Sequence, residues 1–283
     1  MCLIWGTTYL AIRVALETIP PALVGAFRFI FAGSVLMLIL WLKGEMLPAP
    51  RRWTGLALAG LLMVVLGNGA VIWAEQWVPS GVAAVTVAST PFWMIGLEAL
   101  LPGGERLSWR AVLGVLIGFG GIVLLAWPDL TNDGASGRQF AIGMISLQVA
   151  CLGWALGSSY SRRQARSENA LSAAAVQMLC GGLMMLVISV ARGEWSELTF
   201  TPRSLAAEAY LAAVGSLAGY TAYIYALKYL PVSVVSLYAY ANPVIAVLLG
   251  TLLLAEPFGA RVMVATATVL LGITVVPRGE GTR

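Results

Sequence analysis

The sequence predicts an all-α integral membrane protein with ten transmembrane helices, arranged as two inverted five-helix repeats. Only 11% of the 283 residues are charged and 59% are hydrophobic, whereas about a quarter of an ordinary soluble domain is charged. Long apolar runs follow one another along the chain, unlike the alternating segments of about 10 residues that build a β-barrel. The second half also repeats the residue spacing of the first.

A helix needs roughly 20 mainly apolar residues to cross a bilayer. Short connectors rich in Pro, Gly or charge separate the predicted spans, which are 1–16, 22–42, 53–74, 82–101, 109–126, 140–160, 170–191, 205–227, 233–254 and 259–276. The first span is short: Trp5 lies close to its start, whereas the matching Trp154 lies fourteen residues after Phe140. We therefore expect roughly ten residues of the first helix to be missing.

Basic residues predict the orientation of these spans. The connectors on the side of the termini hold eleven Lys and Arg residues, and those on the other side hold four, Arg138, Arg192, Arg203 and Arg261. Because cytoplasmic loops carry the excess of Lys and Arg, both termini are expected in the cytoplasm.

The halves of the chain, 1–128 and 140–277, match each other. The Cys2 to Trp5 segment matches Cys151 to Trp154 at an offset of 149 residues; the further pairs are Pro79 with Pro231, Pro91 with Pro243, Gly67 with Gly219, Glu105 with Glu256, and Gly121 with Gly272. Five crossings per half is an odd number, so the second half enters the membrane from the opposite face. Inverted repeats of this kind are typical of secondary transporters.

Several kinds of chemistry are excluded by composition. The chain has no histidine, which removes Ser-His-Asp centres and histidine-bound metals. Cys2, Cys151 and Cys180 lie in separate apolar runs, so we expect neither disulfides nor a thiolate metal site. No P-loop is present for ATP, and the scattered basic residues form no stripe for nucleic acid. We therefore predict no catalytic residues, metal or cofactor.

Two prolines mark candidate hinges, Pro91 and Pro243, each about halfway along its predicted span. Each removes a backbone donor, so the carbonyls of Val87 and Ala239 lose their usual partners. Backbone groups that lack hydrogen bonds in the middle of the membrane are tolerated only where they are buried in protein or line a water-filled cavity. Either a packing kink or a substrate cavity explains the pattern. The candidate binding residues beside the kinks are Thr86, Thr90, Tyr238 and Asn242.

Aromatic residues supply further candidates for a cavity wall. Trp5 and Trp154 each lie eight residues before an arginine at the end of a span, which places them about 12 Å deep. Packing in the core is the alternative for such residues, although a buried indole N–H needs a partner. Tyr9, Tyr220, Tyr223 and the amide of Asn68 join this predicted lining.

Arg28 is a charge inside a predicted span, which makes it a candidate for function. Its side chain either extends outward to the surface, binds a substrate carboxylate, or pairs with Glu17 or Glu75. Structural pairing is the interpretation that we favour from sequence.

A family resemblance follows from the same residues. The chain resembles the EamA-type domain of the drug/metabolite transporter superfamily in Trp5-Gly6, in Pro20-Pro21 followed by Arg28-Phe29, in the stretch from Pro91 through Glu105 to Ile122, and again from Asn242-Pro243 to Ile273. The resemblance spans nearly the whole chain. It implies a ten-helix bacterial inner-membrane permease, often an exporter of amino acids or related metabolites.

We therefore expect a secondary transporter that exports small amphipathic metabolites by alternating access, with the lipid bilayer and a small-molecule substrate as its partners. A coupled ion or the substrate gradient alone would drive it. A passive channel and a non-transporting membrane scaffold are alternatives. An intramembrane lipid or sugar enzyme is less favoured, because no acid/base cluster can be assembled without histidine.

Overall fold

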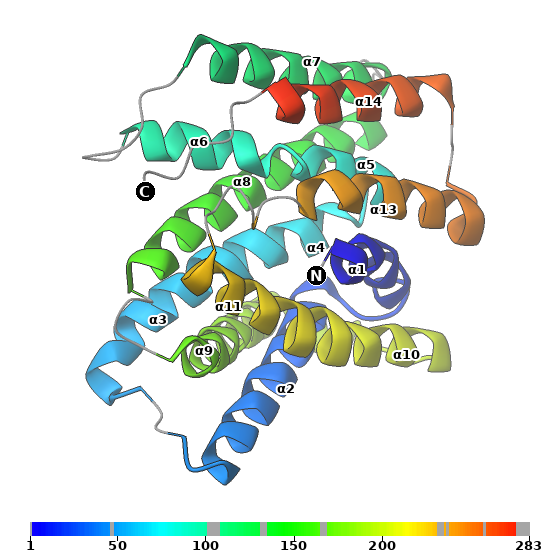
Figure 1. Ribbon diagram of the computed structural model, residues 1–283. Coiled ribbons are helices and arrows are strands. Elements are labelled where there is room, and N and C mark those ends of the chain that lie inside the picture. The colour runs from blue at the N-terminus through cyan, green and yellow to red at the C-terminus, as the bar shows by residue number, and fades with distance from the viewer. Residues whose placement is uncertain are drawn as a thin grey trace.

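The computed structural model describes residues 2–45, 48–100, 108–130, 135–164, 169–230, 235, 238–256 and 259–275. Every regular element in these ranges is helical, which confirms the predicted all-α class. The helices form a bundle in which segments far apart in sequence pack together, as α7 (Trp109–Leu130) and α14 (Ala260–Val275) do (Figure 1). Pro231 and Glu105, which were used in matching the halves, lie outside the described residues.

Up to α7 the chain forms α1 (Cys2–Ala15), α2 (Pro21–Leu42), the 3-10 turn η1 (Pro50–Arg52), α3 (Trp53–Gly60), η2 (Leu61–Gly69), α4 (Ala70–Ala74), α5 (Ser80–Val87) and α6 (Thr90–Leu100). Between α7 and α14 it forms α8 (Ala135–Gln164), α9 (Ala170–Ala191), the 3-10 turn η4 (Glu194–Ser196), α10 (Pro202–Tyr210), η5 (Leu211–Tyr220), α11 (Thr221–Tyr229) and α13 (Tyr238–Leu254).

Seven helical segments of the described chain are long and apolar enough to cross a membrane. They are Pro21–Leu42, Pro50–Ala74, Ser80–Leu97, Trp109–Pro128, Ser136–Arg163, Ala170–Ala191 and Pro202–Tyr229. Three shorter apolar helices are Leu3–Ala15, Ala241–Leu254 and Ala260–Val275. Large side chains such as Trp41, Leu116 and Leu252 are exposed on the outside of the bundle, as a protein that lies in lipid requires.

Two of these segments are less regular than the sequence analysis assumed. The segments Pro50–Ala74 and Pro202–Tyr229 each contain a stretch of π-helix, η2 and η5 respectively. π-helical bonds join residues five apart, and such stretches often occur at functional sites. The Asn68 amide follows the same spacing, because its Nδ2 donates to the Met63 carbonyl oxygen at 3.0 Å.

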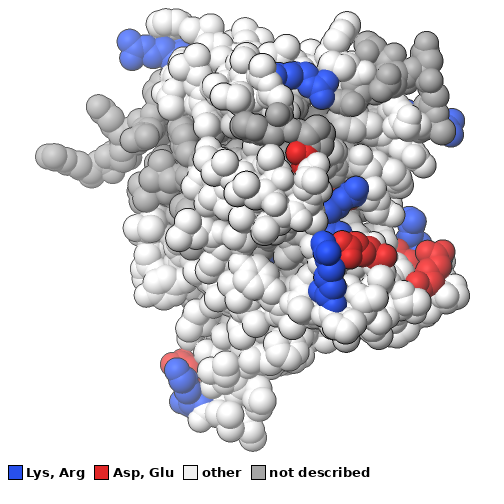
Figure 2. All heavy atoms as spheres, turned by 90° about the vertical axis from the view of Figure 1, so that its right-hand side faces the viewer, with Lys and Arg blue, Asp and Glu red and all other residues white. Residues whose placement is uncertain are grey.

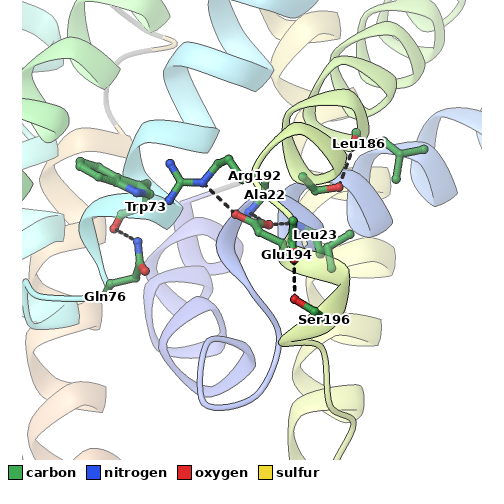
Figure 3. A network of polar contacts seen from close by, with 10 residues as sticks. Ala22, Leu23, Trp73, Gln76, Leu186, Arg192, Glu194 and Ser196 are labelled. Carbon is green, nitrogen blue, oxygen red and sulfur yellow. Dashed lines mark hydrogen bonds and ion pairs between the residues drawn. The ribbon is translucent and has the colours of Figure 1, made fainter.

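Local sequence explains where several helices begin. α2 begins at Pro21, whose fixed φ suits the first position of a helix. The Glu194 side chain of η4 reaches across to this helix, and its Oε2 accepts from the backbone N–H groups of Ala22 and Leu23 at 3.0 and 3.2 Å (Figure 3). α10 begins with a capping box formed by Thr201 and Ser204.

Close contact between α2 and α9 depends on small residues. A Cβ added to Gly33 would lie 2.6 Å from the backbone nitrogen of Leu179, and one added to Gly182 would lie 2.7 Å from that of Ile30. Both distances are shorter than real Cβ atoms allow. Small residues at such an interface let two membrane helices approach closely without a hydrophobic driving force.

Charged groups are sparse on the face of the bundle shown in Figure 2. Most of that face is uncharged, and acidic and basic side chains lie together mainly right of its centre and again at its lower left edge. One ion pair at the junction of the α1–α2 turn and α10 joins Arg203 to Glu17, with 3.2 Å between Nη2 and Oε1. Glu17, one of the two predicted partners of Arg28, therefore pairs with Arg203 instead.

Candidate functional site

A central cavity of about 60 Å³ lies where η2 and the α5–α6 junction meet α1, α2, α8 and α13. Predicted site residues form much of its wall: Trp5, Tyr9, Arg28, Asn68, Thr90, Trp154, Tyr238 and Asn242. The other lining residues were not predicted from sequence; they are Thr8, Ile12, Gly67, Val71, Val87 and Ala150. Residues of both halves of the chain therefore meet around one cavity.

Three predicted binding residues lie behind this wall instead of lining it. Thr86 is buried and its hydroxyl donates to the Val82 carbonyl at 2.9 Å. The Tyr220 hydroxyl donates to Gln177 Oε1 at 2.9 Å. Tyr223 is fully buried and bonds to Trp154. These side chains support the cavity wall, and Pro91 and Pro243 are likewise not among the lining residues.

An aromatic cluster forms one side of the cavity. Trp5 and Trp154 meet edge to face, with ring centroids 5.3 Å apart, and Trp5 meets Tyr238 in the same way at 5.0 Å. Trp5 Nε1 donates to the Gly215 carbonyl at 3.3 Å, and Trp154 Nε1 donates to the Tyr223 hydroxyl at 3.0 Å. Because both indoles have partners, the rings are fixed in place and present apolar surface to the cavity.

Two glycines make room for these indoles. A Cβ on Gly67 of η2 would lie 2.9 Å from the Trp154 ring, and one on Gly219 of η5 would lie 2.6 Å from Trp5 Nε1. The two contacts correspond under the sequence match, since Gly67 matches Gly219 and Trp5 matches Trp154. Each tryptophan therefore rests against a glycine in a π-helical stretch of the opposite half.

The helix break near Pro91 provides polar groups at the cavity. The chain leaves α5 at Val87 and enters α6 at Thr90, directly before the proline. The Val87 carbonyl accepts from the Thr90 hydroxyl at 2.6 Å and contacts the Cys151 thiol at 3.8 Å. Side chains thus replace the backbone donor that Pro91 removes. Pro243 differs, because it lies within the continuous helix α13.

Arg28 is the cationic member of the wall and is only 2% exposed. Its Nε donates to Ser216 Oγ at 2.8 Å, and its guanidinium lies over the Phe29 ring at 4.7 Å from the centroid. Within the described chain, its Nη1 atom has no hydrogen-bond partner. The predicted partner Glu75 is buried and interacts electrostatically with Arg28, but both of its carboxylate oxygens also lack hydrogen-bond partners there.

A buried acid that the sequence analysis did not single out also interacts with Arg28. Glu208 of α10 is buried, and its carboxylate interacts electrostatically with the guanidinium, as that of Glu75 does. The arginine is therefore compensated electrostatically, and its Nη1 atom is a buried donor without a hydrogen-bond partner in the described chain.

A second hollow, of about 240 Å³, lies where the beginnings of α5, α8 and α14 meet the last turns of α13. Its wall includes Trp77, Gly81, Thr251, Glu256 and Arg261. Unlike the central cavity, it contains none of the residues that the sequence predicted for binding.

Known proteins resemble this chain over nearly its whole length. The EamA-like transporter family matches twice, over residues 1–127 and 141–277. The uncharacterized inner membrane transporter YedA of Escherichia coli K12 is 36% identical, and the match covers 98% of this chain and 88% of YedA. Protein PecM of Dickeya dadantii is 27% identical over 96% of this chain and 88% of its own.

A plant relative and a solved structure extend this comparison. A WAT1-related chloroplastic protein of Arabidopsis thaliana is 28% identical over 98% of this chain and 67% of its own. A crystal structure with 23% identity has the same fold, with a TM-score of 0.69, covering 97% of this chain and 92% of that one. The two family matches and the transporter relatives indicate a membrane transporter and not an enzyme. The chain belongs to the EamA-like transporter family.

Proposed function

We propose that this protein is a secondary transporter that exports small amphipathic metabolites, such as amino acids, by alternating access. The observation that carries the proposal is the central cavity, in which residues of both halves meet around an aromatic wall and one buried arginine. A cavity that is mainly apolar, with a few placed polar groups, is typical of small-molecule sites.

The proposed architecture is ten transmembrane helices in two inverted repeats, 1–128 and 140–277. Seven long spans and three shorter apolar helices support the number ten. Matching contacts support the repeats: Gly121 packs on the backbone of Ala265 and on Val269, and Gly272 packs on Gly114 and Gly118, which are the counterparts of those two residues. Two units that correspond in this way can exchange arrangements by rocking around the site between them.

The proposed location is the bacterial inner membrane, with both termini in the cytoplasm. The inner-membrane relative from Escherichia coli supports the membrane. The excess of Lys and Arg in connectors on the side of the termini supports the orientation. Topology reporters fused after Lys43 and after Gly193 test it, because these sites should lie on opposite sides.

The proposed substrate carries a carboxylate and an apolar group. Arg28 Nη1 would donate to the carboxylate, while Trp5, Trp154 and Tyr238 would enclose the apolar part. Hydrogen bonds to charged groups contribute about 1.5–3 kcal/mol. Replacing Arg28 with Gln should therefore weaken binding of carboxylates by roughly tenfold to a hundredfold, and equal binding of a substrate and its amide by the wild type would contradict this role.

Purified protein in liposomes tests the transport proposal. A metabolite screen of efflux from cells that overproduce the protein first supplies candidate substrates. Flux of a candidate that saturates and is competed by analogues supports a carrier, whereas unsaturated flux indicates a channel and absence of flux for every candidate indicates a scaffold. Proton and sodium gradients imposed on the same vesicles determine whether an ion is coupled.

A further inference from the structure

Two glutamates of the second half bind the first turns of helices in the first half. Glu194 follows α9, and its Oε2 accepts from the N–H groups of Ala22 and Leu23 in α2 (Figure 3). Glu256 follows α13, and its Oε1 and Oε2 accept from the N–H groups of Ser80 and Gly81 in α5 at 2.8 and 3.1 Å. The positive end of a helix favours a carboxylate at this position.

Both contacts lie at the same end of the bundle, where α2 and α5 begin and α9 and α13 end. Other polar contacts join the two halves at this end. The Thr18 hydroxyl donates to Ser204 Oγ at 2.7 Å, and the Thr199 N–H donates to the Thr18 carbonyl at 3.1 Å. The ion pair between Arg203 and Glu17 adds to them. This end is therefore held together by hydrogen bonds between the halves.

The backbone is shaped to place Glu256 at α5. Ala255 has φ of 52°, in the left-handed region that non-glycine residues rarely adopt. This turn ends α13 and directs the following glutamate toward Ser80, whose side chain is fully buried. A strained residue directly before a functional contact is a pattern seen at switch regions.

The opposite end of the bundle has a weaker version of the same contact. Glu45 follows α2 just as Glu194 follows α9, and the two glutamates are separated by 149 residues, the offset that matches Trp5 with Trp154. Glu45 Oε2 accepts from the Asn169 side-chain amide at 3.2 Å, in an exposed contact. The first turn of α9 is capped instead by Asn169 itself, whose Oδ1 accepts from the Leu171 N–H at 3.0 Å.

We infer that Glu194 and Glu256 are gate residues, which hold the transport pathway closed at the end where they bind α2 and α5. The inference rests on the proposed alternating-access function and deepens it. When the halves rock, these two carboxylates leave the first turns of α2 and α5, and Glu45 moves from Asn169 onto the first turn of α9. Exchanging these matched contacts closes the other end of the pathway.

Accessibility of the cavity from each side tests this inference without a substrate. In a background with Cys2, Cys151 and Cys180 replaced, Ala150→Cys places a thiol in the cavity wall. A small, membrane-impermeant methanethiosulfonate is added to right-side-out and inverted vesicles. With Glu194 and Glu256 intact, labelling from their end should be slow. Glu194→Ala combined with Glu256→Ala should speed it at least tenfold and slow labelling from the other end.

Single variants separate gating from general damage. Both α2 donors use Glu194 Oε2, so Glu194→Gln keeps this acceptor and loses only the ion pair of Oε1 with the exposed Arg192. Glu194→Gln should therefore label nearly as the parent does. Both oxygens of Glu256 accept, so Glu256→Gln loses one bond and should label several-fold faster. Glu197→Gln, an exposed neighbour in the same connector, is the matched control and should leave labelling unchanged.

The double alanine variant overturns the inference if it is folded and labels at parental rates from both sides. If that variant does not fold, the Gln pair decides: equal labelling of Glu194→Gln and Glu256→Gln overturns the inference, and faster labelling of Glu256→Gln alone supports it. The liposome flux assay is separate from this experiment. Labelling that responds as described in a protein without flux would count against transport of the tested candidates, and would still support the exchange of cavity access that these glutamates control.

Discussion

Replacing Gly33 with Ala tests how closely α2 and α9 must approach. The new Cβ would lie 2.6 Å from the Leu179 nitrogen and 2.9 Å from the Ala175 oxygen, both of them backbone atoms that cannot rotate away. Ordinary contact begins at 3.4 Å. The helices must therefore separate by about 0.8 Å, the difference between 3.4 and 2.6 Å, or bend locally.

Two opposing effects determine the size of the change. Ala is favoured over Gly in a helix by about 1 kcal/mol, whereas overpacking a close interface costs about 1–3 kcal/mol. We expect the free energy of unfolding to fall by up to about 2 kcal/mol, because the Gly182 contact across the same interface also loosens. Thermal unfolding in detergent, followed by tryptophan fluorescence, should show a Tm lower by a few degrees.

A matched glycine supplies the control. Gly120 in α7 is exposed, and a Cβ there would meet nothing within 4 Å. Gly120→Ala should therefore leave the Tm unchanged or raise it. Adding Gly182→Ala to Gly33→Ala should cost less than the sum of the single changes, because both Cβ atoms widen the same interface. A Gly33→Ala Tm equal to or above that of Gly120→Ala would refute the packing argument.

Three further predictions concern the site and its surroundings. Trp154→Ala and Tyr238→Ala should impair transport more than they impair folding, because both side chains line the cavity; equal losses of transport and folded protein would make them structural. Pro243→Ala supplies the missing N–H within α13 and should slow the transport cycle; unaltered turnover in liposomes would count against a hinge. Burial raises the pKa of Glu194, against the lowering effects of Leu23, Ala22 and Arg192. A carboxyl with a raised pKa in the folded protein stabilises the fold while it is protonated, and this contribution is lost as the pH rises above the ordinary value of 4.5. The Tm of the wild type should therefore fall relative to that of Glu194→Gln as the pH rises above this value; a constant difference would oppose this assignment.

The sequence predicted the class of fold and much of the cavity for physical reasons that are local. Apolar runs long enough to cross a bilayer are visible without any tertiary contact. Trp5 and Trp154 were identifiable because they match each other in the two halves of the sequence, and both line the cavity. A residue type that recurs at matching positions in both halves is a stronger indication of a site residue than the same residue in one helix.

The remaining features depend on how each helix is rotated about its own axis. The sequence of a uniformly apolar membrane helix does not determine this rotation. Helices that are hydrophobic all round give no sign of which face meets the cavity, so Thr8 and Val71 were missed while Tyr223 was placed in the lining. The π-helical stretches change the rotation further and bring Ser216 to Arg28. Glu194 and Glu256 shared one usable signal, an acid shortly after the end of an apolar run, and Glu256 also matched Glu105 of the first half.

The 240 Å³ hollow beside Glu256 would offer a way to arrest the proposed carrier from outside its candidate binding site. Its wall contains Gly81 of α5 and Val247 of α13, so a molecule that fills it contacts both helices at once. Such a compound would bind most tightly while these helices are together. At a concentration one hundred times its Kd, the compound would stabilise that arrangement by about 2.7 kcal/mol. A noncompetitive inhibitor, insensitive to substrate concentration, would result.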